Sequence, residues 1–292
     1  MATIIRRRKL GMSSCKGISE FSKKGIKWVR SDRPLPEDDL YIRWGCTSNV
    51  PSKKVLNTAE AIHEVNDKVG FRKVLDDAEL CPPTFFSLAE VREELEVDAD
   101  GDFGAAEIGD GSVIVRPAKH AQGRHVHHCH DYFDVVKAVA KCGHGAYISE
   151  YIKKVAEYRV AVVQGRAVWV VKKTPADPDA IAWNVAKGGR FDNVRWKDWP
   201  LKVVKTAIEG FNLSKLDFGG VDVMVDAEGN CYILEINSAP SLTSPYRQEC
   251  MAKAFDYIIE KGKERIPLID KKGGYTKFIH PALEPKAKLV GE

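Results

Sequence analysis

Three oxygen-bearing side chains in the second half of the chain, Asp222, Glu235 and Asn237, form its strongest chemical pattern. Two apolar runs flank the turn residues 228–230, and this spacing predicts a β-hairpin. Because side chains repeat every second residue along a strand, the hairpin can bring Asp222 opposite Glu235, with Asn237 on the same face. Converging carboxylate and amide oxygens suit a hard cation such as Mg²⁺. A plain hairpin with its acids in water is the alternative, but burying an unpaired Glu235 in its apolar strand would be costly, which favours a bound metal.

The residues around this set resemble the metal-binding end of an ATP-grasp domain of the RimK type or the D-alanyl-D-alanine-ligase type. The resemblance rests on Asp222, on the run Leu-Glu-Ile-Asn at 234–237 and on Pro240. It implies an α/β (α+β) protein with the ATP-grasp fold, in which two α+β subdomains grip ATP. It also implies ATP and Mg²⁺ (or Mn²⁺) as cofactors.

Composition and charge limit the class of protein. The chain has 292 residues, of which 44% are hydrophobic and 29% charged, as is typical of globular proteins. No apolar run is long enough for a membrane span, and the N-terminus lacks the apolar core of a signal peptide, so we expect a cytoplasmic protein. Seven cysteines without a CxxC pair favour reduced thiols. The net charge of +4 is modest, and neither a membrane nor nucleic acid is expected as a partner.

Strand and helix signals, read with the resemblance, divide the chain into four parts. They are a small α/β pre-ATP-grasp unit (1–57), an N-terminal ATP-grasp subdomain with a phosphate hairpin (58–152), a C-terminal subdomain with the metal site (153–265) and a C-terminal tail (266–292). We expect the tail to be loosely ordered from Lys271 onwards. Arg43, at the end of a strand in the first unit, is a weaker candidate for the substrate site.

The first part of the nucleotide site is implied by a passage that begins at Asp67-Lys68. Apolar residues at helical spacing follow it, and Pro82-Pro83-Thr84 ends the helical region. The order resembles the "DK … GxPxPT" passage of the ATP-grasp family, with Leu80 or Cys81 in the place of the glycine, and it implies that Lys68 contacts the nucleotide phosphates. Lys73 remains an alternative for this contact.

A second part is implied by two strand signals, at 113–117 and 126–130, that flank the loop Gln122-Gly123-Arg124. Backbone N–H groups exposed at a glycine can cover phosphates. The hairpin resembles the family's "KP … GxG" hairpin, which implies that Arg116 contacts the nucleotide in the place where lysine is usual; arginine keeps the charge.

The second of these strands is rich in histidine. Its metal-ligating side chains are His125, His127, His128, Cys129 and His130. They suggest zinc, but no second cluster with ligand spacing follows, and we do not favour this interpretation.

The strand that ends at Glu150-Tyr151-Ile152 has the features of an adenine hinge. Backbone groups at Tyr151 and Ile152 can bind the edge of the base while apolar side chains enclose the ring. The segment Glu157-Tyr158-Arg159 resembles the family's "ExR" segment. This resemblance implies that Glu157 holds the ribose and that Arg159 points at the transferred phosphate or the substrate carboxylate.

Two further residues complete the candidate catalytic set with Arg159. Lys172 would supply a second cation from the neighbouring strand. Asn184, together with Lys187, lies in a segment that resembles the family's "N … GG" substrate loop.

The resemblance implies a carbon–nitrogen ligase that uses ATP. A carboxylate attacks the γ-phosphate to give an acylphosphate, and an amine then displaces phosphate to form an amide. The expected partners are small-molecule or peptide carboxylates and amines, and a homo-oligomer is left open. One alternative is a kinase that phosphorylates a hydroxyl at the same site. Another is a nucleotide-binding module without turnover, which Arg116 in the lysine position would favour.

Overall fold

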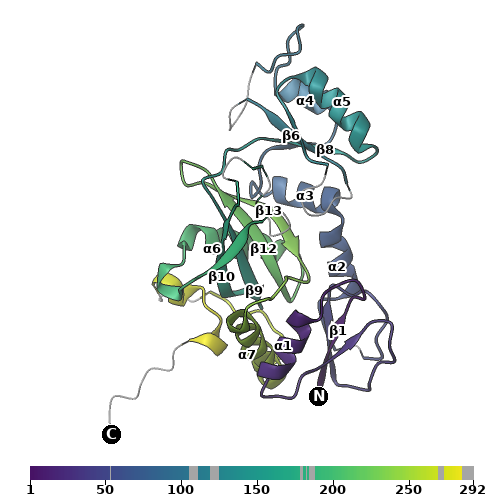
Figure 1. The fold of residues 1–292 in the computed structure, drawn as a ribbon, viewed down its shortest axis with the longest axis vertical. Coiled ribbons are helices and arrows are strands. Elements are labelled where there is room, and N and C mark those ends of the chain that lie inside the picture. The colour runs from purple at the N-terminus through teal and green to yellow at the C-terminus, as the bar shows by residue number, and fades with distance from the viewer. Residues whose placement is uncertain are drawn as a thin grey trace.

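The structure, a computed structural model of the chain, describes residues 1–52, 54–104, 111–118, 125–177, 180–181, 183, 188–268 and 273–284. The described residues form three sheets with helices packed on them, and the sheets follow one another along the long axis of the molecule (Figure 1). The predicted α/β (α+β) mixture of helices and strands is confirmed. No helix within these ranges is long and apolar enough to cross a bilayer.

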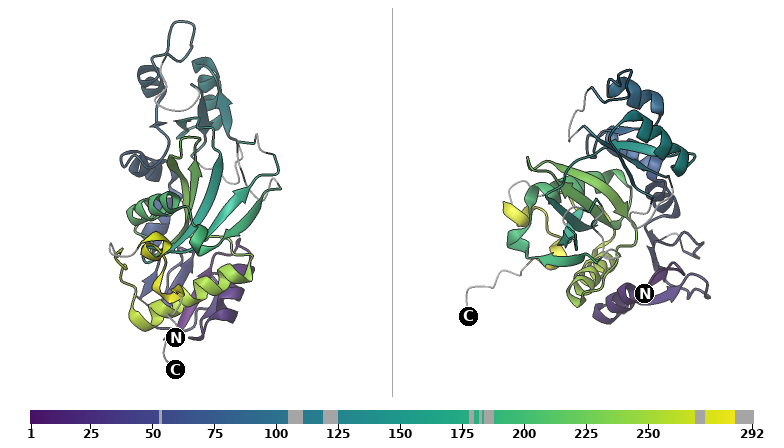
Figure 2. Two further views of the ribbon diagram at one scale, coloured as in Figure 1. Left: turned by 90° about the vertical axis from the view of Figure 1, so that its left-hand side faces the viewer. Right: turned by 45° about the horizontal axis from the view of Figure 1, so that its top comes forward.

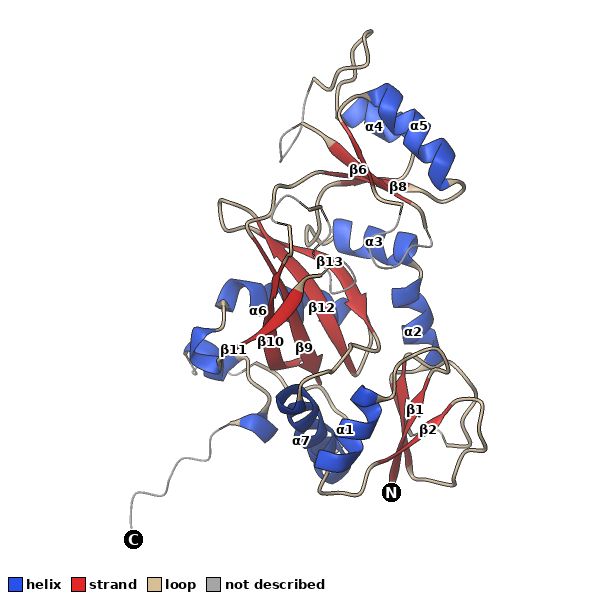
Figure 3. Ribbon diagram, in the orientation of Figure 1, coloured by secondary structure: helices blue, strands red, loops and turns tan. Residues whose placement is uncertain are grey.

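The first sheet is parallel and lies at the end of the molecule that carries the N-terminus (Figure 3). Its strands, in spatial order, are β2 (Lys27–Arg30), β1 (Ala2–Arg6), β3 (Leu40–Trp44) and β4 (Val55–Leu56). Parallel neighbours need a crossover connection, which α1 (Ser13–Phe21) provides between β1 and β2. β1 is buried along its whole length, as is typical of a central parallel strand.

Two short helices, α2 (Ala59–Asn66) and α3 (Lys68–Asp76), lead from the first sheet to the second. The sequence predicts a helical region here, and Asp67 divides it in two. The Asp67 side chain accepts a hydrogen bond from Gly70 N–H and caps α3. Lys68 is therefore the first residue of a helix.

The second sheet is antiparallel and has its own small core. Its strands, in spatial order, are β5 (Thr84–Phe85), β8 (Tyr147–Glu150), β6 (Val113–Arg116) and β7 (His127–Cys129). The helices α4 (Leu88–Glu94) and α5 (Tyr132–Cys142) pack on it through Val91 and Val135, which are both fully buried.

The third sheet is antiparallel and is the largest. Its strands, in spatial order, are β11 (Arg190–Val194), β10 (Arg166–Thr174), β9 (Ala156–Val163), β12 (Phe218–Val225) and β13 (Cys231–Asn237). Of these, β11 has no counterpart among the elements expected from the sequence. The boundaries drawn at 57/58, 152/153 and 265/266 remain a proposal.

Two helices cover different faces of the third sheet (Figures 1 and 2). α6 (Leu201–Leu213) covers one face, because a side chain at Gly219 would meet Phe211 of α6. α7 (Pro245–Lys261) covers part of the other face, where Phe255 packs edge-on against Phe218 with ring centroids 5.0 Å apart. Further along that second face lie the charged side chains of Glu157, Arg159 and Asp222.

The hairpin of β9 and β10 contains a β-bulge that changes which lysine reaches the polar face. Next to the turn, Val162 pairs with Ala167, but the next pair is Ala161 with Trp169. A regular hairpin with this turn would place Lys172 opposite Glu157. Because the bulge adds one residue to β10, Lys173 pairs with Glu157 instead.

The C-terminal segment 273–284 packs against β10, so the expectation of a loose tail from Lys271 is wrong for these residues. Ala167 N–H donates to Phe278 O and His280 N–H donates to Ala167 O, both at 2.8 Å. Phe278, Ile279 and His280 are buried. The apolar Phe-Ile pair explains the packing, because burying it removes a large apolar area from water.

Candidate active site

The predicted pairing of the metal-site hairpin is present in the structure. Asp222 of β12 lies directly opposite Glu235 of β13, and two residues further along each strand Gly220 pairs with Asn237. Directly paired residues project to the same face of a sheet. A side chain at Gly220 would meet Arg159, so this polar face is the one opposite α6.

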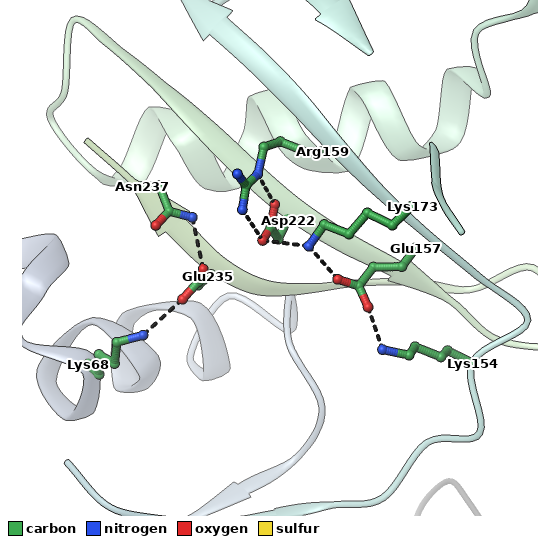
Figure 4. A network of polar contacts seen from close by, with 8 residues as sticks. All are labelled: Lys68, Lys154, Glu157, Arg159, Lys173, Asp222, Glu235 and Asn237. Atoms are coloured by element: carbon green, nitrogen blue, oxygen red, sulfur yellow. Dashed lines mark hydrogen bonds and ion pairs between the residues drawn. The ribbon is translucent and has the colours of Figure 1, made fainter. Parts of the chain in front are cut away.

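Asp222 lies at the centre of a buried network of charges (Figure 4). Arg159 Nε donates to Asp222 Oδ1 at 2.5 Å and Arg159 Nη2 to Oδ2 at 2.7 Å, while Lys173 Nζ donates to Oδ2 at 2.7 Å. The Asp222 side chain is only 4% exposed. Burial alone would raise its pKa, but the charges of Arg159 and Lys173 hold the pKa of Asp222 well below its usual range.

Glu157 belongs to the same network. Its two carboxylate oxygens accept hydrogen bonds from Lys173 and from Lys154, and all three side chains are at most 10% exposed. Burial lowers the pKa of Lys154, and the nearby charge of Glu157 opposes that effect. Phe191 of β11 closes the network on one side, with Lys173 Nζ 5.6 Å and Arg159 Cζ 5.2 Å from its ring centroid.

Glu235 is the more accessible carboxylate, with 38% of its side chain exposed. Lys68 Nζ donates to Glu235 Oε2 and Asn237 Nδ2 donates to Oε1, both at 2.9 Å. Lys73, the alternative to Lys68, instead lies with its Nζ 4.7 Å from the ring centroid of Phe86. The structure thus brings Lys68 to the acids and leaves Lys73 away from them.

Lys68 reaches Glu235 because α3 is fixed to the edge of the third sheet. Arg72 Nη1 donates to the carbonyl of Ile233 at 3.3 Å and Arg72 Nη2 to that of Leu234 at 2.8 Å. Ile233 N–H in turn donates to Leu80 O at 2.7 Å. These bonds satisfy the backbone groups of β13, which is an edge strand, and they set the start of α3 beside the polar face.

The donor chemistry of Asp222, Glu235 and Asn237 suits Mg²⁺, because all three offer hard oxygens on one face of two adjacent strands. Within the described residues there is no group of three or more His, Cys, Asp or Glu side chains that could hold a metal. Both oxygens of Asp222 already accept from side-chain cations. Three of the about four acceptor sites of the Asp222 carboxylate are thus occupied, and Oδ1, with a single donor, is the oxygen that has room for a metal.

Lys172 is a correction to the expected catalytic set. It is exposed and pairs with Tyr158 on the face away from the network, whereas Lys173 supplies the cation beside Arg159. The sequence reasoning also missed Lys154. Its signal was the spacing of three residues from Glu157, and Figure 4 shows both side chains at the edge of the network.

At the expected adenine hinge, Tyr151 N–H donates to Ser112 O at 2.8 Å. This N–H is therefore already paired and is not available to a base edge, whereas a contact through the Tyr151 carbonyl stays a prediction. Glu150 and Ile152 are both buried. Arg116 Nη1 donates to Ser149 Oγ at 2.8 Å, which holds the guanidinium at the end of β6 beside the hinge strand β8.

The structure describes only some of the other expected residues. Gln122, Gly123, Arg124 and Asn184 lie outside the described residues. His128 Nε2 lies 2.6 Å from Ser112 Oγ. Arg43 donates to the carbonyls of Cys46 and Ser48 and thereby holds the loop after β3.

Comparison with known proteins identifies the family of the chain. The family model of the RimK-like ATP-grasp domain matches residues 94–258, more than half of the chain. A search of curated proteins finds no match.

Among solved structures, similar folds include a RiPP-associated ATP-grasp ligase from Chryseobacterium gregarium in complex with ADP and a leader and core peptide. It is 13% identical, and the match covers 91% of this chain and 99% of that one with a TM-score of 0.62. D-alanine–D-alanine ligase from Bacillus anthracis is 15% identical, with 89% and 96% coverage and a TM-score of 0.61. The macrocyclase MdnC from Microcystis aeruginosa, bound to precursor peptide MdnA, is 14% identical, with 86% and 98% coverage and a TM-score of 0.56.

Proposed function

Since the chain belongs to the RimK-like ATP-grasp family, we propose that it is an ATP- and Mg²⁺-dependent ligase that joins a carboxylate to an amine. The observation that carries this proposal is the pairing of Asp222 with Arg159 and Lys173 beside Glu235 (Figure 4). Carboxylates for a metal and cations for a transferred phosphate lie side by side, because Asp222, which binds Arg159 and Lys173, is directly opposite Glu235. Phosphoryl transfer needs both.

The proposed reaction has two steps. A carboxylate oxygen of the acid substrate forms a bond to the γ-phosphorus of ATP, and the bond from that phosphorus to the β,γ-bridging oxygen breaks. The amine nitrogen then attacks the carbonyl carbon of the acylphosphate, the carbon–oxygen bond to phosphate breaks, and the nitrogen loses a proton to water. Phosphorylation is required because a free carboxylate has no adequate leaving group for amine attack.

The side chains of this chain would bind and orient the reactants. Arg159 and Lys173 would neutralise charge on the transferred phosphoryl oxygens. Asp222, Glu235 and Asn237 would hold Mg²⁺, which when bound neutralises charge on the phosphate oxygens. Lys173 is buried between two carboxylates, which raise its pKa although burial opposes them. It therefore stays protonated and acts as a fixed cation.

The nucleotide would lie between the second and third sheets. Lys68 and Arg116 would contact its phosphates, Glu157 its ribose, and the hinge residues Glu150 and Ile152 its base. Lys68 and Glu157 support this arrangement because both belong to the polar face that carries Asp222. For the loop residues 122–124 and for Asn184, contacts with the phosphates and the substrate are proposed from the family resemblance alone.

The substrate class we propose is a small-molecule or peptide carboxylate with an amine partner. Peptides are supported by the relatives that bind them, namely the RiPP-associated ligase with its leader and core peptide and MdnC with its precursor peptide. Amino acids are equally consistent with the likeness to D-alanine–D-alanine ligase. These likenesses concern the fold, and the substrate class is a proposal.

Isotope transfer tests the proposed reaction. Candidate amino acids and peptides, labelled with ¹⁸O in the carboxylate, are incubated with the protein, ATP and Mg²⁺, and the released phosphate is analysed by mass spectrometry. A ligase that works through an acylphosphate moves one labelled oxygen into phosphate, and hydroxylamine traps a hydroxamate when the amine is omitted. A stable phosphoester with unlabelled phosphate would instead identify a kinase, and ATP binding without any product would identify a binding module.

Arg159 gives this experiment an internal control. Arg159→Ala should suppress hydroxamate trapping more than it weakens nucleotide binding, because Arg159 lies beside the reacting groups and not at the proposed base pocket. Arg190→Ala is the matched control, since Arg190 is an exposed arginine of the same sheet whose ion-pair partner among the described residues is exposed Asp192. Equal effects of the two substitutions would remove Arg159 from the mechanism.

A further inference from the structure

Arg247 is a buried arginine whose donors are mostly unused. It is 5% exposed, and among the described residues its Nε and Nη1 have no hydrogen-bond partner. Its Nη2 donates to Thr243 Oγ1 at a long distance of 3.4 Å. Burying a guanidinium without an anion or full hydrogen bonding is costly, so its place in the protein requires an explanation.

Other buried arginines of the chain do not share this feature. Arg43 Nε and Arg166 Nη2 also lack a partner among the described residues. Both arginines, however, donate to two or more backbone carbonyls and so hold loops in place. Arg247 donates to no carbonyl or carboxylate in the described residues. Its guanidinium therefore lacks the structural partners that explain Arg43 and Arg166.

The position of Arg247 connects it to the active site. Its Cζ lies 5.8 Å from the centroid of the Trp169 ring, and Trp169 Nε1 is also buried without a partner among the described residues. Trp169 pairs with Ala161 and, two residues along the same face, Val171 pairs with Arg159. Because side chains on one face of a strand repeat every two residues, about 7 Å apart, Arg247 lies about one row from Arg159.

The electrostatic surroundings of Arg247 are positive. Burial lowers the pKa of Arg247, and the charge of Arg159 lowers it further. An arginine with a positive neighbour and no acidic partner creates a site for an anion. The three unused nitrogens, Nε and Nη1 of Arg247 and Nε1 of Trp169, provide the hydrogen bonds for it.

We propose that Arg247 and Trp169 bind a carboxylate of the acid substrate, one row away from the reacting phosphate. This inference rests on the proposed ligase function. The fork of a guanidinium matches a carboxylate in geometry. Both acids proposed for Mg²⁺, Asp222 and Glu235, lie in the row of Arg159, whereas Trp169 lies in the next row with Ala161 and Gly220. A carboxylate therefore fits this position better than a nucleotide phosphate.

A neighbouring cavity offers space for the rest of that substrate. It has a volume of about 420 Å³ and is lined by Asn193, Val194, Arg195, Trp196 and Tyr246. Asn193 pairs with Val171 and so faces the polar side of the sheet, and Tyr246 precedes Arg247 on α7. Its aromatic and aliphatic walls suit the organic part of an amino-acid-sized substrate.

Thermal unfolding with simple anions tests the site without knowledge of the substrate. The Tm of the full chain is measured with 50 mM sodium malonate, with sodium phosphate and with sodium chloride at equal ionic strength. Malonate should raise the Tm by about 2 °C or more over chloride, because an anion that binds only the folded state stabilises it. The rise should be lost in Arg247→Met and reduced in Arg247→Lys, which keeps the charge but not the fork.

A matched variant and the anion-free Tm separate this role from a structural one. Lys253→Met removes one positive charge from an exposed position on the same helix and should keep the full malonate shift. In chloride alone, Arg247→Met should have an unchanged or higher Tm, since an apolar side chain replaces a buried charge.

Three results would overturn the proposal. They are a malonate shift retained in Arg247→Met, a shift with phosphate but not malonate, and a clear fall in the Tm of Arg247→Met in chloride. None of these measurements depends on turnover. The isotope experiment can therefore fail while the anion site stands, and the anion site can fail while the ligase reaction stands.

Discussion

Lys173 on β10 reaches across β9, the strand between, and places its Nζ 2.7 Å from Asp222 Oδ2 on β12. Four cations lie around three carboxylates on this face. The cations are those of Lys173, Arg159, Lys154 and Lys68, and the carboxylates are those of Asp222, Glu157 and Glu235. The excess of positive charge suits an anionic polyphosphate. The same cations keep three neighbouring carboxylates from repelling one another in the free protein.

The two adjacent lysines of β10 should respond differently to substitution. Lys173→Met leaves buried Asp222 and Glu157 each short of a charge partner, so unfolding experiments with denaturant should show a loss of about 3 kcal/mol in the free energy of unfolding. Lys172→Met removes an exposed side chain and should change it by less than about 0.5 kcal/mol. Equal losses in the two variants would contradict the bulged register.

Glu235 should be required for metal-dependent turnover. Glu235→Gln removes one negative charge from the proposed metal site while keeping the side chain's size, so steady-state turnover with ATP and Mg²⁺ should fall at least about a hundredfold with the fold intact. Glu228→Gln, an exposed glutamate in the turn of the same hairpin, is the control and should retain activity. Turnover in Glu235→Gln at the level of the control would remove Glu235 from the metal site.

Arg116 should contribute to nucleotide affinity. A charge-assisted hydrogen bond contributes about 1.5–3 kcal/mol, so Arg116→Ala should weaken ATP binding about tenfold or more in a calorimetric titration. Arg116→Lys should recover much of the loss because it keeps the charge. Arg92→Ala, at an exposed position in the same subdomain, should bind ATP normally, and normal binding by Arg116→Ala as well would show that the hairpin of β6 and β7 has another role.

The hairpin that carries Asp222 and Glu235 could be predicted from the sequence, because its two strands and its turn are local. Its exact register could not. Next to the turn Val223 pairs with Ile233, so a regular hairpin would place Leu234 opposite Asp222, and a bulge between Asp222 and Val223 brings Glu235 there. A bulge in β10 likewise places Lys173 where Lys172 was expected, and neither bulge is evident from the residue types.

Non-local contacts account for the other differences. Tyr151 N–H donates to the carbonyl of Ser112, which directly precedes β6 and is distant from Tyr151 in the sequence. β11 was not expected because its sequence, Arg-Phe-Asp-Asn-Val, has few apolar residues. It is an edge strand that pairs with β10 alone, and an edge strand can be short and polar. Arg247 shows its unused donors only when burial and hydrogen bonds are known.

The docked C-terminal segment contains a buried histidine that is held neutral. His280 Nε2 lies 3.1 Å from Gln164 Oε1, and its Nδ1 accepts a hydrogen bond from Ala282 N–H at 3.2 Å. These contacts use the neutral ring, with the proton on Nε2. Burial first, and then the charge of Arg166, lowers the pKa of His280 from 6.5 to about 3.

Stability should therefore fall in mild acid because of His280. The unfolded chain takes up a proton below pH 6.5 and the folded protein does not, so the contribution of His280 is complete above pH 6.5 and decreases as the pH falls towards 3. Between pH 7.5 and 5 the wild type should lose about 2 kcal/mol more in its free energy of unfolding than His280→Gln, which has no titrating ring. Denaturant unfolding of both proteins at the two pH values measures this difference. Parallel losses would mean that His280 is protonated in the folded protein, and that segment 273–284 is not packed against β10 as described.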